Sequence, residues 1–154
     1  MEEIQAQNLP DEVSKDVFLV YTDSGRTKFT LEAPIIHKYT KDTNYTEFPE
    51  GVDAVFYNKY GQQTSKGRSG YALKIKQDDE VIFRDSVRFE NYKGEVLRSE
   101  EIYLINDTIY SDTTVFIETP NLILEGIGLT APKDFSTYTL LKPVGVYNVP
   151  PNKE

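Results

Sequence analysis

The sequence predicts an all-β protein, because three features of its 154 residues favour strands over helices. The chain has 11 Tyr and 8 Phe, which together with Val, Ile and Thr suit the half-buried surface of a sheet. Apolar and polar residues alternate with a period of two in many segments. Clusters of Gly, Pro, Asn and Asp separate these segments, as tight turns require. Many short strands with such breaks are typical of a sandwich or a barrel-like roll.

Six segments show the alternation most clearly. They are 26–33 (RTKFTLEA), 51–58 (GVDAVFYN), 71–75 (YALKI), 86–91 (SVRFEN), 112–119 (DTTVFIET) and 121–126 (NLILEG). In an antiparallel sheet one set of alternate side chains faces the interior and the other faces water. The predicted inward-facing residues are Phe29, Leu31, Phe56, Leu73, Val87, Phe89, Leu104, Val115, Ile117, Leu122 and Leu124. The pattern leaves open whether they fill a closed core or line an apolar groove.

The strand-and-turn outline recurs along the chain. Gly25, Gly61 and Gly94 each begin a comparable unit, 36 and 33 positions apart, and a fourth unit begins near Asn121, 27 positions further on. A period near 30 residues is a signal of stacked hairpins. The alternative is a chance alignment of generic strand patterns. If the repetition is real, the inner faces of the hairpins form one continuous apolar slot.

Composition excludes several classes of function. The net charge of −8 argues against a nucleic-acid partner, since binding to phosphates needs a basic face. The chain has no Cys, which excludes disulfides, thiolate metal sites and thiol nucleophiles. No segment approaches the roughly 18 consecutive apolar residues of a membrane helix. One folded domain of ordinary globular composition is expected.

Signals for catalysis are weak. His37 is the only histidine, so there is no second one for a metal pair or a triad. Glu100 and Glu101 are adjacent and would point to opposite faces of a strand, which is unsuitable for a paired-carboxylate site. We therefore expect no enzyme activity, no cofactor and no metal.

The last predicted strand, 143–149 (PVGVYNV), begins with Pro143 and is followed by the Pro pair at 150–151. One interpretation is that these prolines protect an exposed sheet edge from pairing. The other is that they frame a strand that pairs with another chain. For the second, the candidate partner-strand residues are Val144, Val146, Tyr147 and Val149.

The order of motifs resembles the LptC family, the periplasmic component of lipopolysaccharide export, and most of all its Bacteroidetes-like form. The resemblance is carried by YTDSGRTKFTLEAPIIHKY at 21–39, EFPEGVDAVFYNKYG at 47–61 and the long run from LRSEE to STYTL at 97–140. It extends from about Val17 to Val149. No single motif is decisive, but their ordered set is specific.

The resemblance implies an open antiparallel β-jellyroll, V-shaped with a hydrophobic groove, as in the bridge protein LptA. It implies a non-catalytic lipopolysaccharide carrier in the periplasm of the cell, with the acyl chains in the groove. The partners would be LptF/LptG-like transporter subunits of the inner membrane and an LptA-like bridge that pairs with an edge strand. Gly25 and Gly126 align with structural glycines of the family, where a Cβ would distort a hairpin.

The resemblance implies an N-terminal inner-membrane anchor, which we expect to be absent from this chain. We therefore expect residues 1–16 to be a polar linker after a removed anchor, 17–149 to be the jellyroll and 150–154 to be a tail. Two alternative functions stay open. One is a carbohydrate-binding or adhesive β-sandwich with a filled core and Tyr side chains on an outer face. The other is a free LptA-like bridge subunit that assembles into filaments through both edges.

Overall fold

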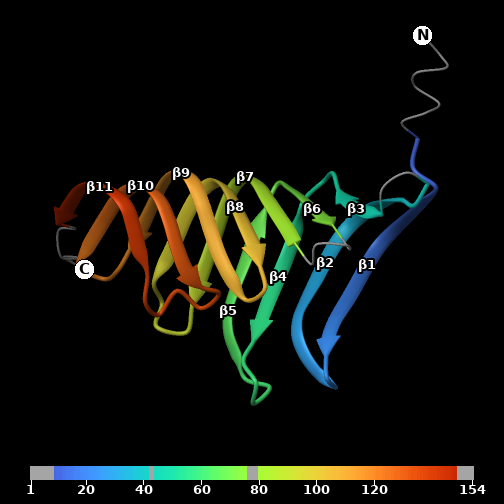
Figure 1. Ribbon diagram of the computed structural model, residues 1–154, viewed down its shortest axis with the longest axis horizontal. Coiled ribbons are helices and arrows are strands. Elements are labelled where there is room, and N and C mark those ends of the chain that lie inside the picture. The colour runs from blue at the N-terminus through green and yellow to red at the C-terminus, as the bar shows by residue number, and fades with distance from the viewer. Residues whose placement is uncertain (1–8, 42–43, 76–79, 149–154) are drawn as a thin grey trace, which may run out of the picture.

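The computed structural model describes residues 9–41, 44–75 and 80–148, which form one antiparallel sheet of eleven strands (Figure 1). The strands are β1 (Glu12–Asp23), β2 (Arg26–Tyr39), β3 (Tyr45–Phe48), β4 (Val52–Tyr57), β5 (Gln63–Ser69), β6 (Tyr71–Ile75), β7 (Glu80–Asn91), β8 (Val96–Ile105), β9 (Thr108–Glu118), β10 (Leu122–Pro132) and β11 (Thr139–Asn148). Their order is β11-β10-β9-β8-β7-β5-β4-β2-β3-β6, with β1 paired to β2. This arrangement confirms the prediction of an all-β jellyroll. β1 begins at Glu12, inside the segment that we expected to be a linker.

Two long strands each pair with two shorter ones, and this closes a ring in the middle of the molecule. β2 pairs with β4 through residues 29–32 and with β3 through 37–39. β7 pairs with β6 through 80–84 and with β5 through 88–91. Since β4 also pairs with β5, and β3 with β6, the six strands form a closed ring. We call the side with β4 and β5 the first layer, and the side with β3 and β6 the second layer.

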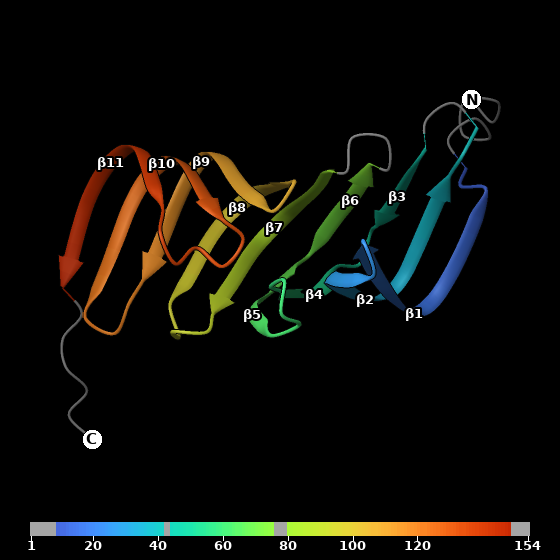
Figure 2. The ribbon, with the colours of Figure 1, turned by 60° about the horizontal axis from the view of Figure 1, so that its bottom comes forward.

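β8 to β11 extend the sheet from β7, and the long strands curve from one layer into the other (Figures 1 and 2). The pairing register of these long strands is interrupted between Arg84 and Val87 in β7 and between Ser99 and Tyr103 in β8. It breaks again near Gly128 in β10, where φ is 86°. A bulge bends the strand that contains it. Aligned in neighbouring strands, these bulges produce a single crease between the two layers.

Small hydroxyl side chains stabilise the crease in β8 and β9. The Ser99 Oγ donates to the Thr114 carbonyl at 2.9 Å, and the Ser111 Oγ donates to the Glu101 carbonyl at 2.9 Å. The Ser99 Oγ also lies 3.1 Å from the Thr113 Oγ1. A break in the ladder removes partners from backbone groups, and an unpaired buried carbonyl is costly. The hydroxyls replace the partners that the bend removes.

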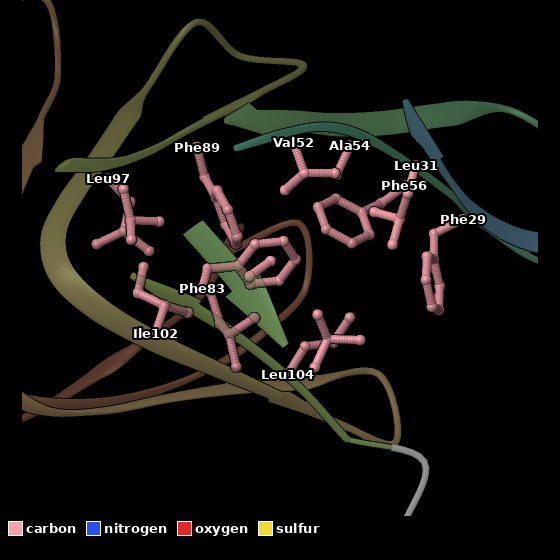
Figure 3. Packing of buried hydrophobic residues seen from close by; sticks show 14 of the residues in the cluster. Phe29, Leu31, Val52, Ala54, Phe56, Phe83, Phe89, Leu97, Ile102 and Leu104 are labelled. Carbon is pink, nitrogen blue, oxygen red and sulfur yellow. The ribbon is translucent and has the colours of Figure 1, made fainter. Parts of the chain in front are cut away.

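The apolar core lies between the two layers (Figure 3). Phe83 and Phe89 come from the two halves of β7, and their rings meet edge to face with centroids 5.3 Å apart. Phe56 of β4 lies 5.5 Å from Phe89, and Phe29 of β2 continues the row at 6.1 Å from Phe56. Such offset and edge-to-face pairs add to the stabilisation that burial of the rings provides. The aromatic row therefore joins both layers through the middle of the ring.

The recurring glycines of the sequence mark turns. Gly25, Gly61 and Gly94 lie in the β1–β2, β4–β5 and β7–β8 turns, each with a φ near +80°. The β4–β5 and β7–β8 turns lie with the β9–β10 turn along the lower edge of the molecule in Figure 2. The segments between them differ, since 26–60 contains β2, β3 and β4 whereas 95–118 contains only β8 and β9. The period thus reflects regular turn spacing.

The prediction for Leu73 is wrong. β6 buries Ala72 and Lys74, whereas Leu73 is only partly buried and lies outside the core cluster. In the register with β7, Ala72 is opposite Phe83, whose large ring leaves room for a small neighbour only. Leu73 is opposite Ile82 on the other face of the strand. Alternation showed that β6 has two different faces, but the neighbouring ring decided which face is buried.

Candidate functional site

The candidate functional site is the apolar interior between the two layers. Of the residues predicted to line it, the buried ones are Phe29, Leu31, Phe56, Val87, Phe89, Leu104, Val115 and Ile117. Leu124 is partly buried and packs against this cluster, whereas Leu122 is partly buried and lies outside it. They come from β2, β4, β7, β8, β9 and β10, so one continuous apolar surface extends along the sheet.

Sequence reasoning missed several residues of the same interior. They include Phe83, Leu97, Ile102, Ile109, Leu129 and Phe135. Phe83 belongs to the run VIF at 81–83, where three consecutive apolar residues conceal the period of two. Phe135 lies in the polar segment KDFS, which reads as a surface turn. Its burial depends on contacts with distant segments, which no local pattern records.

The interior has an opening beside β1. A hollow of about 270 Å³ is lined by Tyr21, Phe29, Val81 and Leu104, together with the polar residues Thr22, Asp23, Lys28, Asn106 and Asp107. Tyr21 stacks on Phe29 with ring centroids 4.6 Å apart, and burial raises the pKa of Tyr21 to about 12. Val17, Leu19 and Tyr21 of β1 also pack against the core from this side. An apolar chain can therefore contact interior side chains at the β1 end of the sheet.

The two layers meet at the crease and form a V, and we call the side opposite the crease the mouth. The segment between β10 and β11, residues 133–138, bridges the mouth, and we call it the β10–β11 loop. The Ser65 Oγ of β5 donates to the Lys133 carbonyl at 3.0 Å, and the Asn91 Nδ2 of β7 donates to the Asp134 carbonyl at 3.1 Å. Next to these two anchors the Phe135 side chain is completely buried in the core. The β10–β11 loop thus joins the second layer, where β10 ends, to two strands of the first.

A cluster of charges lies beside this loop. The Asp107 carboxylate in the β8–β9 turn is 3.0 Å from the Lys28 Nζ of β2 and 3.3 Å from the Lys133 Nζ. Burial alone would raise the pKa of Asp107, but the hydrogen bond from Lys28 and the charge of Lys133 outweigh it and lower the pKa. Lys28, Asp107 and Lys133 also line a hollow of about 460 Å³, together with Arg26 and Lys59.

The two ends of the sheet are unpaired in the part of the chain that the structure describes. β11 pairs only with β10, and Val144, Val146 and Tyr147 are exposed on it, Val146 to 64%. Val149, the fourth candidate for partner pairing, lies outside the described residues. At the other end β1 pairs only with β2 and exposes Phe18 to 63%. Unpaired N–H and C=O groups of an edge strand are available to another chain.

The two predicted structural glycines differ in their constraints. Gly25 has a φ of +78°, a conformation that side chains with a Cβ rarely adopt, although no atom lies within 4 Å of the position of a Cβ. Gly126 has an ordinary φ, but a Cβ there would lie 3.1 Å from the Leu140 side chain. Gly126 therefore allows β11 to pack closely on β10.

A group of tyrosines lies on the outer face of the second layer. Tyr39 and Tyr45 stack with centroids 4.6 Å apart. The Tyr71 hydroxyl donates to the Glu47 carboxylate at 2.7 Å, and the Tyr39 hydroxyl donates to it at 3.3 Å. His37 Nδ1 is 3.7 Å from the same carboxylate. The hydroxyls of Tyr39 and Tyr71 are thus engaged within the protein, in contrast to an open sugar platform.

The acidic side chains of the described residues lie outside the apolar interior. The buried polar side chains among them include no Asp or Glu. No group of three or more His, Asp or Glu in residues 9–41, 44–75 and 80–148 is placed to hold a metal ion. Glu101 accepts hydrogen bonds from Arg84 at 2.5 Å and Tyr103 at 2.6 Å, which lower its pKa, and it lies on the outer surface.

The fold and the interior together define a class of protein: a β-jellyroll with a continuous apolar interior between two layers and, within the described residues, an edge strand at each end of the sheet. Residues 2–148 match the family model described as "Lipopolysaccharide-assembly, LptC-related", and the chain belongs to this family. The family is a non-enzymatic component of lipopolysaccharide transport, periplasmic and associated with the inner membrane. A search of the curated proteins found no match. No helix in the described part of the chain has the length and apolar character to cross a membrane.

Proposed function

We propose that this protein is a periplasmic carrier that holds the acyl chains of lipopolysaccharide between its two layers, while the sugars stay in water. The observation that supports this most directly is the continuous apolar surface from β2 to β10 with an opening beside β1. Transfer of one saturated chain of about 12 methylenes out of water is worth roughly 10 kcal/mol, at about 0.8 kcal/mol for each CH₂. A comparable apolar slot in the carrier offsets that cost without any catalytic group.

The carrier would receive the lipid from LptF/LptG-like subunits of the inner-membrane transporter and pass it to an LptA-like bridge. The unpaired edge of β11 supports the second step, because an added strand would continue the sheet and its apolar inner face into the next protein. The energy for transport would come from the transporter, since this chain needs only to bind and release. Tethering at the inner membrane would keep the carrier beside its source.

Photo-crosslinking tests the carrier function. Benzoylphenylalanine at Phe29, which lines the hollow beside β1, should form an adduct with lipopolysaccharide in cells that assemble the transport machine. The matched control is the same substitution at Phe18, which is on the neighbouring strand, is also aromatic and is exposed outside the core. Adducts at Phe18 with none at Phe29 would contradict a groove and favour binding on an outer face.

The free-bridge alternative makes a different prediction about assembly. A bridge subunit uses both unpaired edges, β1 and β11, and forms filaments whose length increases with concentration. A tethered carrier uses β11 for the bridge and remains a small species by itself. Sedimentation velocity over a hundredfold range of concentration separates the two.

A further inference from the structure

The interior that the carrier function requires is filled in this structure. Phe135 occupies part of it, fully buried among the core side chains, although it belongs to a loop and not to a strand. An acyl chain that enters from the mouth between the layers must take the place of this ring. The β10–β11 loop is therefore the segment whose movement would make room for a lipid.

Polar contacts hold the backbone around Phe135. The carbonyls of residues 133 and 134 accept from Ser65 and Asn91, and the Phe135 N–H donates to the Pro132 carbonyl at 2.8 Å. Lys133 adds an ion pair with Asp107, which also pairs with Lys28 of β2. Partly exposed pairs of this kind are worth little in water and exchange readily for other charged partners. This part of the loop is thus closed by ion pairs that a charged ligand can replace.

The ion pairs border a hollow whose lining contains charged side chains of both signs, with cations in slight excess. Arg26, Lys28, Lys59 and Lys133 line the space of about 460 Å³ beside the β10–β11 loop, together with the carboxylates of Asp23, Asp107 and Asp134. Arg26 and Lys59 have no ion pair within residues 9–41, 44–75 and 80–148. The lining therefore has one more cation than carboxylates, in contrast to the net charge of −8 of the whole chain. A phosphate ester, which carries about −1.5 to −2 charges at neutral pH, matches the ammonium groups of Lys28 and Lys133 better than the Asp107 carboxylate that they share.

We propose that the β10–β11 loop is a latch over the mouth of the interior, and that the phosphate headgroup of an amphipathic lipid opens it by replacing Asp107 on Lys28 and Lys133. Once the ion pairs exchange, Phe135 leaves the core and an acyl chain takes its place. The hollow holds the headgroup while the interior holds the chain. This inference rests on the proposed carrier function and identifies the β10–β11 loop as the place where the acyl chain enters.

A fluorescent reporter tests the latch. The chain has no Trp, so Phe135→Trp gives a single emitter inside the core. Dihexanoyl phosphatidic acid should shift its emission to the red and increase quenching by acrylamide several-fold. Dihexanoyl phosphatidylcholine and inorganic phosphate should have much smaller effects. An equal response to phosphatidylcholine would overturn the role of the phosphate, and an equal response to inorganic phosphate would overturn the role of the acyl chain.

Charge variants in the Phe135→Trp background locate the anion site. Lys133→Gln should raise the concentration of dihexanoyl phosphatidic acid needed for half the response roughly tenfold, as expected for loss of one charged hydrogen bond. The matched control Lys93→Gln removes a lysine from the β7–β8 turn, away from the hollow, and should change nothing. Equal effects of the two variants would exclude a specific site.

Hydrogen exchange on the unmodified chain tests the latch without the Phe135→Trp substitution, so the result does not depend on how an introduced tryptophan packs. Dihexanoyl phosphatidic acid should accelerate exchange in residues 133–138 while β7 and β8 stay protected. Slower exchange in the loop, or no change, would overturn the latch. If lipopolysaccharide still crosslinks to position 29, the carrier function stands and only the latch fails. Loss of both results would reject the carrier function itself.

Discussion

Gly67 lies where β5 passes the ring of Phe89 at close range. The two residues are paired across β5 and β7, and a Cβ on Gly67 would be 2.2 Å from the Phe89 Cδ1. Phe89 is fully buried and contacts both Phe56 and Phe83, so its ring cannot move aside easily. The glycine therefore permits the aromatic row that joins the two layers.

Substitution of Gly67 should destabilise the fold through this clash. We expect Gly67→Ala to lower the free energy of unfolding by about 1–3 kcal/mol, the usual range for overpacking. Urea denaturation measures it, and Phe89→Leu in the same chain should recover part of the loss because the ring is gone. Gly61→Ala is the control: it acts through a φ of +80° with no neighbour within 4 Å, so Phe89→Leu should not rescue it.

The ion pairs of Asp107 at the mouth of the interior make the stability of the fold depend on pH. Its folded-state pKa lies below the unfolded value of about 3.8, because Lys28 and Lys133 favour the carboxylate. The stabilisation is therefore complete above that value and is lost as the pH falls through the lower folded pKa. Asp107→Asn should lower the midpoint of thermal unfolding at pH 7 and reduce the difference between pH 7 and about pH 3. Asp112→Asn, on an exposed residue of β9 outside the described ion pairs, should preserve that difference.

β11 combines an unpaired backbone edge with exposed apolar side chains. We expect a proline-rich replacement of residues 144–148 to abolish binding to an LptA-like bridge protein, since it removes N–H groups that an added strand needs. The control Val144→Thr with Val146→Thr keeps the backbone and should retain most of the binding. Surface plasmon resonance measures both, and circular dichroism verifies the fold. Normal binding by the proline-rich variant would exclude β11 as the docking edge.

β6 illustrates how far local pattern reasoning extends. The alternation in YALKI correctly predicted a strand with two unlike faces. Leu73, which shares its face with Tyr71 and Ile75, was expected to face inward. Phe83 of β7 fills the volume beside β6, so Ala72 faces the core and Lys74 is buried with its ammonium 5.4 Å from the Tyr21 ring. The register between strands, and not the composition of one strand, determined the buried face.

The sheet as a whole differs in stability between its closed middle and its open ends. The ring of β2 to β7 pairs every strand on both sides, and β8 and β9 contribute fully buried residues such as Leu97, Ile102 and Ile117. β11 is exposed along most of its length and β1 along much of its own. Opening of a segment costs less where fewer apolar contacts must break.

Native-state hydrogen exchange should report this gradient. Amides of β7 and β8 should exchange with a free energy close to that of global unfolding. Amides of β11 should exchange with a markedly smaller value, because only β10 holds that strand. Equal protection in β8 and β11 would mean that the edge has a partner in solution, for example a second copy of the chain.

The sequence alone determined the all-β class, the positions of several strands and turns, and part of the apolar interior. These properties depend on neighbours within a few residues: alternation places side chains on opposite faces, and glycine permits the turns at positions 25, 61 and 94. The tertiary structure was needed for the closed ring, for the burial of Phe135 and for the cluster of Lys28, Asp107 and Lys133. Those features join residues that are far apart in the chain, and only the bending of the long strands at the crease brings them together across the mouth of the interior.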